Sequence, residues 1–442
     1  MKTAAFHNLG CKVNAYEMEA MQELLTAHGY EIVPFEERAD VYIVNTCSVT
    51  NIADKKSRQM LHRAKRRNPQ AVVVAAGCYV QSAGEKLLED AAVDILISNN
   101  EKGRLPEILK AWEEEHTAGS VRDLSREHSY EELSISRTGE HTRAFVKIQD
   151  GCDQFCSYCI IPYTRGRVRS RRLSDILEEA RCLAEGGCQE LVLTGIHLDS
   201  YGIDLNGENL LTVIEALHEI DGICRIRLGS LEPRIMTEDF VRALAGQEKL
   251  CPHFHLSLQS GCDATLRRMN RKYDTAQFRQ CCERLRCHFH EPALTSDVIV
   301  GFPGETEEEF AETLAFLKEI RFYETHVFPY SRRKGTRADR MPDQIPASVK
   351  AQRSDILLAL SEENSRAYRE RLIGTEVEVL LEEACTINSE PYLVGYTREY
   401  VKVAVPAAQA GMNQILGVQA DTLAGEILLG MPEPRNLSEK SR

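Results

Sequence analysis

The feature that most constrains the fold of this chain is a short loop with three cysteines spaced C-x3-C-x2-C: Cys152, Cys156 and Cys159. A strand-like apolar run, 144–149, comes directly before it. Three thiolates on so short a loop can converge on one inorganic cluster. A [4Fe–4S] cluster normally takes four cysteine ligands, so three would leave one iron open. Because catalytic metals keep an open position, the loop predicts a catalytic cluster. Three packed or solvated cysteines are the alternative.

Length and composition limit the class of protein. At 442 residues the chain exceeds one ordinary core, so we expect two or three domains. A net charge of −13 argues against a protein that coats nucleic acid through general positive charge. No apolar run approaches the ~18 residues of a membrane span, and the first residues lack the apolar segment of a signal peptide. The fifteen cysteines then indicate reduced thiols and metal ligands, so we expect a cytoplasmic protein without a membrane partner. We also expect a monomer.

Residues 1–115 alternate short apolar runs with longer periodic segments. The runs, which we expect to be strands, are 3–6, 41–44, 71–75 and 94–97. The helical segments between them are 15–28, 52–67 and 81–91. This alternation predicts an open, mostly parallel α/β sheet as an N-terminal domain.

Three further cysteines follow strands of this sheet. Cys11, Cys47 and Cys78 each come shortly after a strand-like run. The carboxyl ends of parallel strands meet at one edge, where open α/β sheets place ligands. We therefore expect the three thiols to lie together. Buried core cysteines are the alternative.

A polar stretch, 116–141, indicates a linker, after which the alternation of strands and helices resumes in a central domain, 142–370. The expected strands are 144–149, 190–196, 225–231, 253–259, 294–302 and 325–330. Six strand–helix units predict a partial (β/α)6 barrel, in which the loops after the strands carry chemistry. The loop with three cysteines is the first of these. A charged helix, 347–371, ends the domain.

Residues 371–434 have a different sequence pattern, with short strand-like runs separated by turn residues. The runs are 376–381, 392–396, 400–405 and 425–429. A module of this size fits a small closed β-barrel of a kind that often binds RNA. We expect the tail, 435–442, to be disordered. The fold class is thus a multidomain α/β protein with a small all-β barrel at its C-terminus.

The sequence as a whole resembles the methylthiotransferases of the radical SAM superfamily, where SAM is S-adenosylmethionine. The C-x3-C-x2-C spacing is the signature of that superfamily, and the C-terminal module resembles a TRAM domain. Within the family, Asn-Leu-Gly-Cys-Lys-Val-Asn at 8–14 and Asn-Thr-Cys-Ser-Val-Thr-Asn at 45–51 look like the bacterial MtaB branch. That resemblance implies methylthiolation of C2 of N6-threonylcarbamoyladenosine at position 37 of tRNA, beside the anticodon.

The resemblance also implies cofactors and site residues. Cys152, Cys156 and Cys159 would hold a [4Fe–4S] cluster that cleaves SAM. Cys11, Cys47 and Cys78 would hold an auxiliary [4Fe–4S] cluster. Two SAM molecules are expected, one as methyl donor and one as radical source. Polar residues and glycines at strand ends, where a ligand can approach closely, would form the SAM pocket with a tyrosine of the cysteine loop. These residues are Tyr158, Thr194, Gly195, Ser257, Gln259 and Gly301.

Arginines alternate just after the cysteine loop. They are Arg165, Arg167, Arg169 and Arg171, with Arg172 adjacent. In an extended chain the first four would share one face and form a phosphate-binding strip. We expect it to hold tRNA around a base that is splayed out of the anticodon loop. The further partners expected are an electron donor such as flavodoxin or ferredoxin, and a sulfur source.

Three other functions stay open. In the first, the enzyme methylthiolates isopentenyladenosine in tRNA, and in the second it modifies a ribosomal-protein side chain. The substrate distinguishes these two, because the first yields a modified RNA nucleoside and the second a modified peptide. A non-enzymatic iron–sulfur protein, either an electron carrier or an RNA-binding sensor, is the third, and it would not bind SAM.

Overall fold

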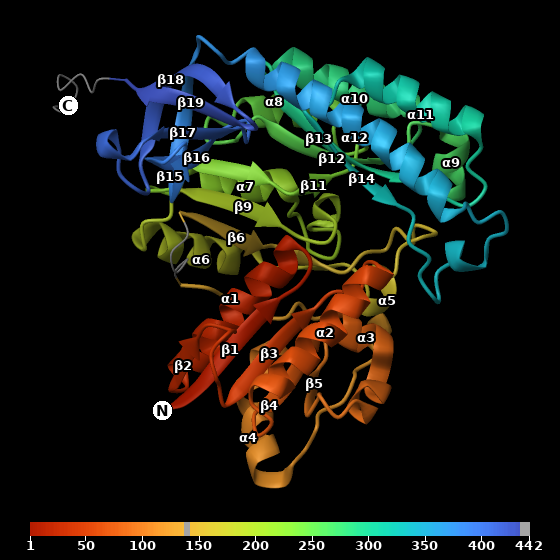
Figure 1. Ribbon diagram of the computed structural model, residues 1–442, viewed down its shortest axis with the longest axis vertical. Helices are drawn as coiled ribbons and strands as arrows, with labels where there is room; N and C mark the ends of the chain where they lie inside the picture. The colour runs from red at the N-terminus through yellow and green to blue at the C-terminus, as the bar shows by residue number, and fades with distance from the viewer. Residues whose placement is uncertain (137–141, 434–442) are drawn as a thin grey trace.

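The structure is a computed structural model that describes residues 1–136 and 142–433, and its chain forms three regions (Figure 1). An N-terminal α/β region lies below a central barrel, and a small all-β region lies beside that barrel. This arrangement confirms the expected fold class. Residues 137–141 of the expected linker and the expected disordered tail, 435–442, lie outside the described residues. The domain boundaries stay predictions.

The N-terminal region is a parallel five-stranded sheet in the order β2-β1-β3-β4-β5. Its strands are β1 (Lys2–Asn8), β2 (Tyr30–Val33), β3 (Val41–Thr46), β4 (Val72–Gly77) and β5 (Ile95–Ile97). Its helices are α1 (Lys12–Ala27), α2 (Asn51–Arg67), α3 (Cys78–Ala83) and α4 (Leu105–Glu115). Apolar side chains of α1 and α4 pack on one face of the sheet and those of α2 on the other. The central strands are therefore buried on both faces and have apolar sequences.

Two details of this region differ from the expectation. Strand β2 was not predicted, because it has four residues at the sheet edge and none of them is buried. The helix expected over 81–91 is wrong, since α3 ends at Ala83 and a 3₁₀ segment, Gly84–Glu89, follows. Gly84 has φ +70, which ends the α-helix because that backbone conformation does not continue it.

The central region is the expected partial (β/α)6 barrel, and all its main strands are parallel. Its strands are β6 (Arg143–Lys147), β9 (Glu190–Thr194), β10 (Arg225–Leu228), β11 (Ser230–Leu231), β12 (His253–Gln259), β13 (Ala293–Val300) and β14 (Glu324–Pro329). They form two sheets, β10-β9-β6 and β11-β12-β13-β14, and β10 leads directly into β11. A short ribbon, β7 (Gln149–Asp150) and β8 (Arg169–Ser170), flanks the cysteine loop.

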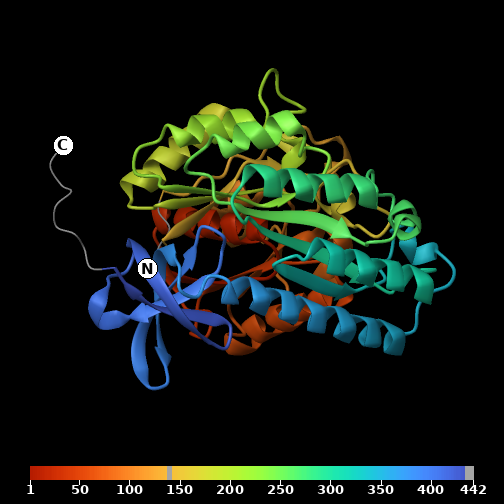
Figure 2. The ribbon, with the colours of Figure 1, turned by 90° about the horizontal axis from the view of Figure 1, so that it is seen from above.

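Helices cover the outside of this barrel (Figure 2). They are α6 (Leu173–Glu185), α7 (Leu210–His218), α8 (Glu238–Ala245), α9 (Asp263–Arg268), α10 (Thr275–His288), α11 (Glu307–Ile320) and α12 (Ala347–Glu370). Alternate strand residues such as Phe254, Leu256 and Leu258 pack in the core with these helices. Because side chains of a strand alternate between its faces, His253, His255 and Ser257 face the inside of the barrel.

The C-terminal region is a closed β-barrel in the order β15-β16-β17-β19-β18. Its strands are β15 (Glu376–Ile387), β16 (Glu390–Thr397), β17 (Lys402–Pro406), β18 (Ile415–Ala424) and β19 (Ile427–Pro432). The long strand β18 was not predicted, because its sequence lacks a continuous apolar run. The module docks at the amino ends of the central strands, where Arg225 pairs with Glu378 (2.8 Å). Across the described residues, no helix combines the length and apolarity needed to cross a membrane.

Candidate active site

The C-x3-C-x2-C loop lies between β7 and α5 (Ile161–Thr164), just after the first barrel strand. Its first turn requires Gly151, which has φ +72 and where a Cβ would lie 1.8 Å from the Arg167 carbonyl oxygen. Burial and the nearby Cys156 thiol raise the pKa of Cys152 to about 12. Burial and Cys156 also raise the pKa of Cys159. The Cys156 thiol thus affects the pKa of both other cysteines of the loop, and the role of the three as cluster ligands stays a prediction.

Hydrogen-bond donors point at these sulfur atoms. Arg271 donates to Cys156 Sγ (3.2 Å), and the backbone N–H of Gln154 donates to Cys152 Sγ (3.5 Å). Such donors favour the thiolate, whereas burial opposes it. A bound cation resolves this conflict, since it deprotonates a coordinating thiol outright. Three convergent thiols with donors aimed at them fit the ligand set of an iron–sulfur cluster.

The N-terminal sheet brings Cys11, Cys47 and Cys78 to its carboxyl edge. Cys11 precedes α1, Cys47 follows β3, and Cys78 begins α3 directly after β4. A Cβ on Gly10 would lie 3.1 Å from Cys47 Sγ, so the loop before α1 touches the second cysteine. Burial, together with the Cys78 and Cys11 thiols, raises the pKa of Cys47 to about 11. Their role as cluster ligands stays a prediction, but the sheet topology places them as expected.

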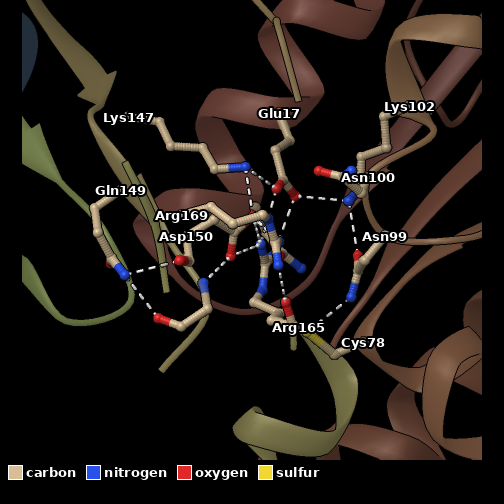
Figure 3. A network of polar contacts seen from close by, with 12 residues as sticks. Glu17, Cys78, Asn99, Asn100, Lys102, Lys147, Gln149, Asp150, Arg165 and Arg169 are labelled. Carbon is tan, nitrogen blue, oxygen red and sulfur yellow. Dashed lines mark hydrogen bonds and ion pairs between the residues drawn. The ribbon is translucent and has the colours of Figure 1, made fainter. Parts of the chain in front are cut away.

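A buried ionic network lies between helix α1 of the N-terminal region and the strands β6 and β7 that lead to the barrel cysteines (Figure 3). Glu17 of α1 accepts hydrogen bonds from Arg165 (2.9 Å) and Lys147 (2.8 Å) and pairs with Lys102 (3.1 Å). Asp150 pairs with Lys147 (2.7 Å) and Arg165 (3.0 Å). Burial alone would raise the pKa of Glu17, but these three cations hold it well below its usual value. The carboxylates of α1 and of the cysteine loop thus share the same cations.

Two asparagines connect this network to the N-terminal cysteines. Asn14 accepts from Arg165 (2.7 Å) and donates to the carbonyl of Thr46 (3.0 Å), the residue before the second cysteine. Asn99 donates to Cys78 Sγ (3.7 Å) and to a carbonyl at the end of α5 (2.8 Å). Each contact links an N-terminal cysteine loop to the segment that follows the barrel cysteines.

A second contact holds the N-terminal region on the opposite side. Arg333, in the segment after β14, donates to Asp54 (2.6 Å), Ser48 (2.7 Å) and Asn51 (2.8 Å). Ser48 follows Cys47 directly. Since Arg333 is buried, these hydrogen bonds are protected from water. The carboxyl edge of the N-terminal sheet is therefore fixed against the barrel at two places.

The residues expected to bind SAM lie around the mouth of the barrel. Thr194 ends β9, Gly195 follows it, Ser257 and Gln259 lie on β12, Gly301 follows β13, and Tyr158 lies in the cysteine loop. A Cβ on Gly195 would lie 3.0 Å from Gln149 Oε1. At Gly301, with φ +66, it would lie 2.4 Å from Cγ of Lys350. The close approach that this glycine permits is thus to the lysine of α12. Binding of SAM by these residues stays a prediction.

A polar chain beside Cys156 was missed by sequence reasoning. Arg271, which donates to that cysteine, pairs with Glu232 (2.8 Å), and His197 lies 3.5 Å from the same carboxylate. Burial would raise the pKa of Glu232, but the nearby His197 imidazole and the charge of Arg271 lower it to about 2. Burial raises the pKa of Asp199, which accepts from the Glu232 backbone N–H, to about 7. Nothing in the local sequence around Arg271, Glu232 or Asp199 indicates that these residues meet.

The exposed arginine strip is wrong for most of its members. Arg165, Arg169 and Arg171 are buried. Arg165 belongs to the network with Glu17, and the partner of Arg171 is Glu179. Buried and paired guanidinium groups cannot reach a phosphate on the surface. Arg167 and Arg172 are exposed and remain candidates for contact with RNA.

A partial (β/α)6 barrel whose first strand leads into a C-x3-C-x2-C loop defines a radical SAM enzyme. Residues 146–317 match the family described as "Radical SAM superfamily", and residues 3–98 match "Uncharacterized protein family UPF0004". The chain is 41% identical over 422 residues to "Threonylcarbamoyladenosine tRNA methylthiotransferase MtaB" of Bacillus subtilis (strain 168), covering 95% of this chain and 94% of that one. It is 36% identical to "tRNA-2-methylthio-N(6)-dimethylallyladenosine synthase" of Moorella thermoacetica, covering 97% and 99%. The chain belongs to the radical SAM tRNA methylthiotransferases.

A solved structure shares the fold. The radical SAM methyltransferase TsrM from Kitasatospora setae superimposes with a TM-score of 0.57 at 16% identity, covering 76% of this chain and 77% of that one. This likeness concerns the fold alone. Membership of the radical SAM superfamily implies a [4Fe–4S] cluster and SAM, and the N-terminal family match suggests a second cluster.

Proposed function

We propose that this enzyme methylthiolates C2 of N6-threonylcarbamoyladenosine beside the anticodon of tRNA. The observation that carries the choice of base is the 41% identity, over nearly the whole of both chains, to a relative named for that nucleoside. Relatives named for dimethylallyladenosine reach 34–38%. The Gly10-Cys11-Lys12-Val13-Asn14 motif supports the same choice.

We assign Cys152, Cys156 and Cys159 to the cluster that cleaves SAM, and Cys11, Cys47 and Cys78 to an auxiliary [4Fe–4S] cluster. When bound, a cluster with an open iron supplies a binding place for SAM and the electron that cleaves it to a 5′-deoxyadenosyl radical. Such chemistry suits C2 of adenine, an unactivated aromatic carbon that acid–base side chains cannot readily functionalise. One SAM would provide the methyl group and a second the radical.

The chain's own residues would hold the two proposed sites opposite each other. The Glu17–Arg165 contact and the Arg333 contact keep the N-terminal cysteines over the barrel. Arg271 donates a hydrogen bond to Cys156 and is itself held in place by its ion pair with the buried Glu232. A base that enters between them must leave the stack of the anticodon loop. Arg167, Arg172 and the TRAM barrel would bind the RNA backbone around it. An electron donor such as flavodoxin or ferredoxin and a sulfur source complete the partners we propose.

The proposal is tested by mass analysis of tRNA nucleosides from cells with and without the gene. We expect the methylthio form of threonylcarbamoyladenosine to vanish and the form without it to accumulate. Re-expression of the wild type should restore the product, whereas Cys156→Ala should not. Loss of methylthio-dimethylallyladenosine instead would overturn the choice of base. Unchanged nucleosides would overturn the RNA substrate and bring forward a modified peptide.

A further inference from the structure

The short helix α5 adjoins both cysteine sets. It begins at Ile161, two residues after Cys159, and it packs against α3, the helix that begins at Cys78 (Figure 1). The carbonyl of Thr164, its last residue, accepts a hydrogen bond from Asn99 (2.8 Å), whose amide also donates to Cys78 Sγ (3.7 Å). A side chain that projects from α5 into solvent therefore lies beside the place where a target base would enter.

Tyr163 is such a side chain, with an exposed fraction of 54%. Among the tyrosine, phenylalanine and tryptophan side chains of residues 1–136 and 142–433, only Phe328 of β14 is also exposed. Tyr163 follows the first barrel strand, and Phe328 lies near the carboxyl end of the last one. Both exposed rings thus lie on the side of the barrel where folds of this kind bind their ligands.

Tyr163 belongs to a group of side chains on the surface of the cysteine loop. Its ring meets the ring of Phe155 edge to face, with the centroids 5.8 Å apart. The guanidinium of Arg167, which is exposed, lies over the Phe155 ring (4.9 Å). Two aromatic rings and a cation are therefore in contact beside the barrel cysteines. Proteins bind single-stranded nucleic acid with such groups, because the rings stack on bases and the cations follow the backbone.

The backbone beneath this group is held in an uncommon conformation. Phe155 has φ +48, a left-handed conformation that is unfavourable for a bulky side chain. The side-chain amide of Asn270 donates to its carbonyl (2.9 Å) and so fixes the loop from the barrel side. Strain of this kind persists only where the surrounding structure determines it, and it gathers at functional sites. The loop thus holds Phe155 in place as a support for the exposed ring of Tyr163.

A base of the anticodon loop fits the open face of Tyr163. When the target adenosine leaves the stack to reach the cysteines, its neighbours in the loop lose a stacking partner. An exposed ring beside the entrance can replace that partner, since unstacked RNA bases are commonly bound by aromatic side chains. We infer that Tyr163 stacks on a base next to the target adenosine and so holds the loop open. This inference rests on the proposed function, which places the target beside the anticodon.

The test measures binding of an anticodon stem-loop RNA with threonylcarbamoyladenosine to the reconstituted enzyme by fluorescence anisotropy. Tyr163→Phe keeps the ring, Tyr163→Leu keeps only an apolar side chain, and Tyr163→Ala removes both. Leu358→Ala is the matched control, because Leu358 is an exposed apolar residue on α12. Tyr163→Leu and Tyr163→Ala should weaken binding about five- to a hundredfold, as loss of a base–aromatic stack does, whereas Tyr163→Phe and the control should stay within about twofold.

A second RNA, which lacks the bases on both sides of the target, identifies the contact. The wild type should bind it more weakly than the intact RNA, and Tyr163→Leu should cause no further loss, because ring and base form one pair in a double-mutant cycle. The loss with the intact RNA should not shrink as salt rises, unlike the loss of a phosphate contact. An equal loss with both RNAs would overturn the inference, as would wild-type binding of the intact RNA by Tyr163→Leu.

Two further readouts separate stacking from other roles of the ring. Iron content of Tyr163→Leu, and its 5′-deoxyadenosine production with a chemical reductant, should match those of the wild type, since no cysteine is altered. A loss of iron would mean that the ring supports the cysteine loop and would overturn the inference. Normal RNA binding with slower SAM cleavage by a protein electron donor would assign the surface to that donor instead. If the wild type binds neither RNA, the proposed function itself fails.

Discussion

The two cysteine sets, which we propose to hold similar clusters, are assembled by different structural routes. Cys152, Cys156 and Cys159 lie on one loop, so their proximity is a local property of the chain. Cys11, Cys47 and Cys78 come from three separate loops, and only the order of strands in the sheet brings them together. The first set should tolerate disturbance elsewhere in the molecule. The second depends on the packing of the N-terminal region and on the ionic network beneath it.

The largest effect on activity should come from a change in the local set, which is Cys152, Cys156 and Cys159. Cys156→Ala should reduce SAM cleavage below detection, because it removes one of the three proposed thiol ligands and the acceptor of Arg271. The measurement is 5′-deoxyadenosine formed by the reconstituted, reduced enzyme. Cys182→Ala is the control, since Cys182 is an exposed cysteine on α6. Undiminished 5′-deoxyadenosine in Cys156→Ala would refute the assignment of the barrel cysteines.

A change in the dispersed set, which is Cys11, Cys47 and Cys78, should separate SAM cleavage from formation of the methylthio product. Cys47→Ala should leave SAM cleavage within about twofold of the wild type and stop formation of the methylthio product. The physical reason is that Cys47 lies against Gly10 in the N-terminal region, while the barrel loop stays intact. Product is measured by mass analysis of tRNA nucleosides after reaction in vitro. Normal product would show that the N-terminal cysteines are structural, and lost SAM cleavage would show that the two sets are not independent.

A change in the ionic network around Glu17 should have the next largest effect, and this effect is on stability. Glu17→Gln leaves Lys102, Lys147 and Arg165 short of a buried anion, and breaking a buried pair costs about 3–5 kcal/mol. We expect a lower urea midpoint of unfolding and faster hydrogen exchange in α1 and β6. Because the pKa of Glu17 is depressed in the folded state, this stabilisation is present at neutral pH. It is lost as pH falls through the folded-state pKa. An unchanged midpoint would contradict the role of the network.

Glu19→Gln on the same helix is the matched control. Burial and the charges of Glu23 and Glu179 raise the pKa of Glu19 to about 7, so its ionised form is disfavoured in the folded protein. Removing that carboxyl should not destabilise the protein, and above pH 7 it should stabilise it. The gain should shrink as pH falls toward the ordinary pKa of glutamate, where the group is neutral in both states. The two variants, both on α1, should thus change the stability of the protein in opposite directions.

The contrast between the sets also explains what sequence could predict. The barrel loop was evident from cysteine spacing, and the N-terminal set from the repeated order of strand and cysteine. The arginines after the loop were misjudged because their partners are remote in sequence. Glu17 is 148 positions from Arg165, and nothing in the local pattern shows that the two meet. Arg271 and Glu232 were missed for the same reason. Pairing between distant charged residues is set by tertiary packing, whereas alternation and spacing are local.

The smallest effect should come from Arg167, which belongs to the same run of arginines but is exposed. Its guanidinium lies over the Phe155 ring (4.9 Å) and pairs with Asp153 (3.2 Å), and exposed pairs of this kind contribute little to stability. Arg167→Glu should therefore leave folding unchanged and weaken tRNA binding several-fold. The loss should shrink at higher salt, with the salt slope reduced by about one unit. Arg181→Glu, on the exposed side of α6, is the control for net charge. Equal losses in both variants would indicate general repulsion. A loss specific to Arg167 places the RNA backbone beside the local cysteine set, so that the dispersed set must approach the base from the opposite side.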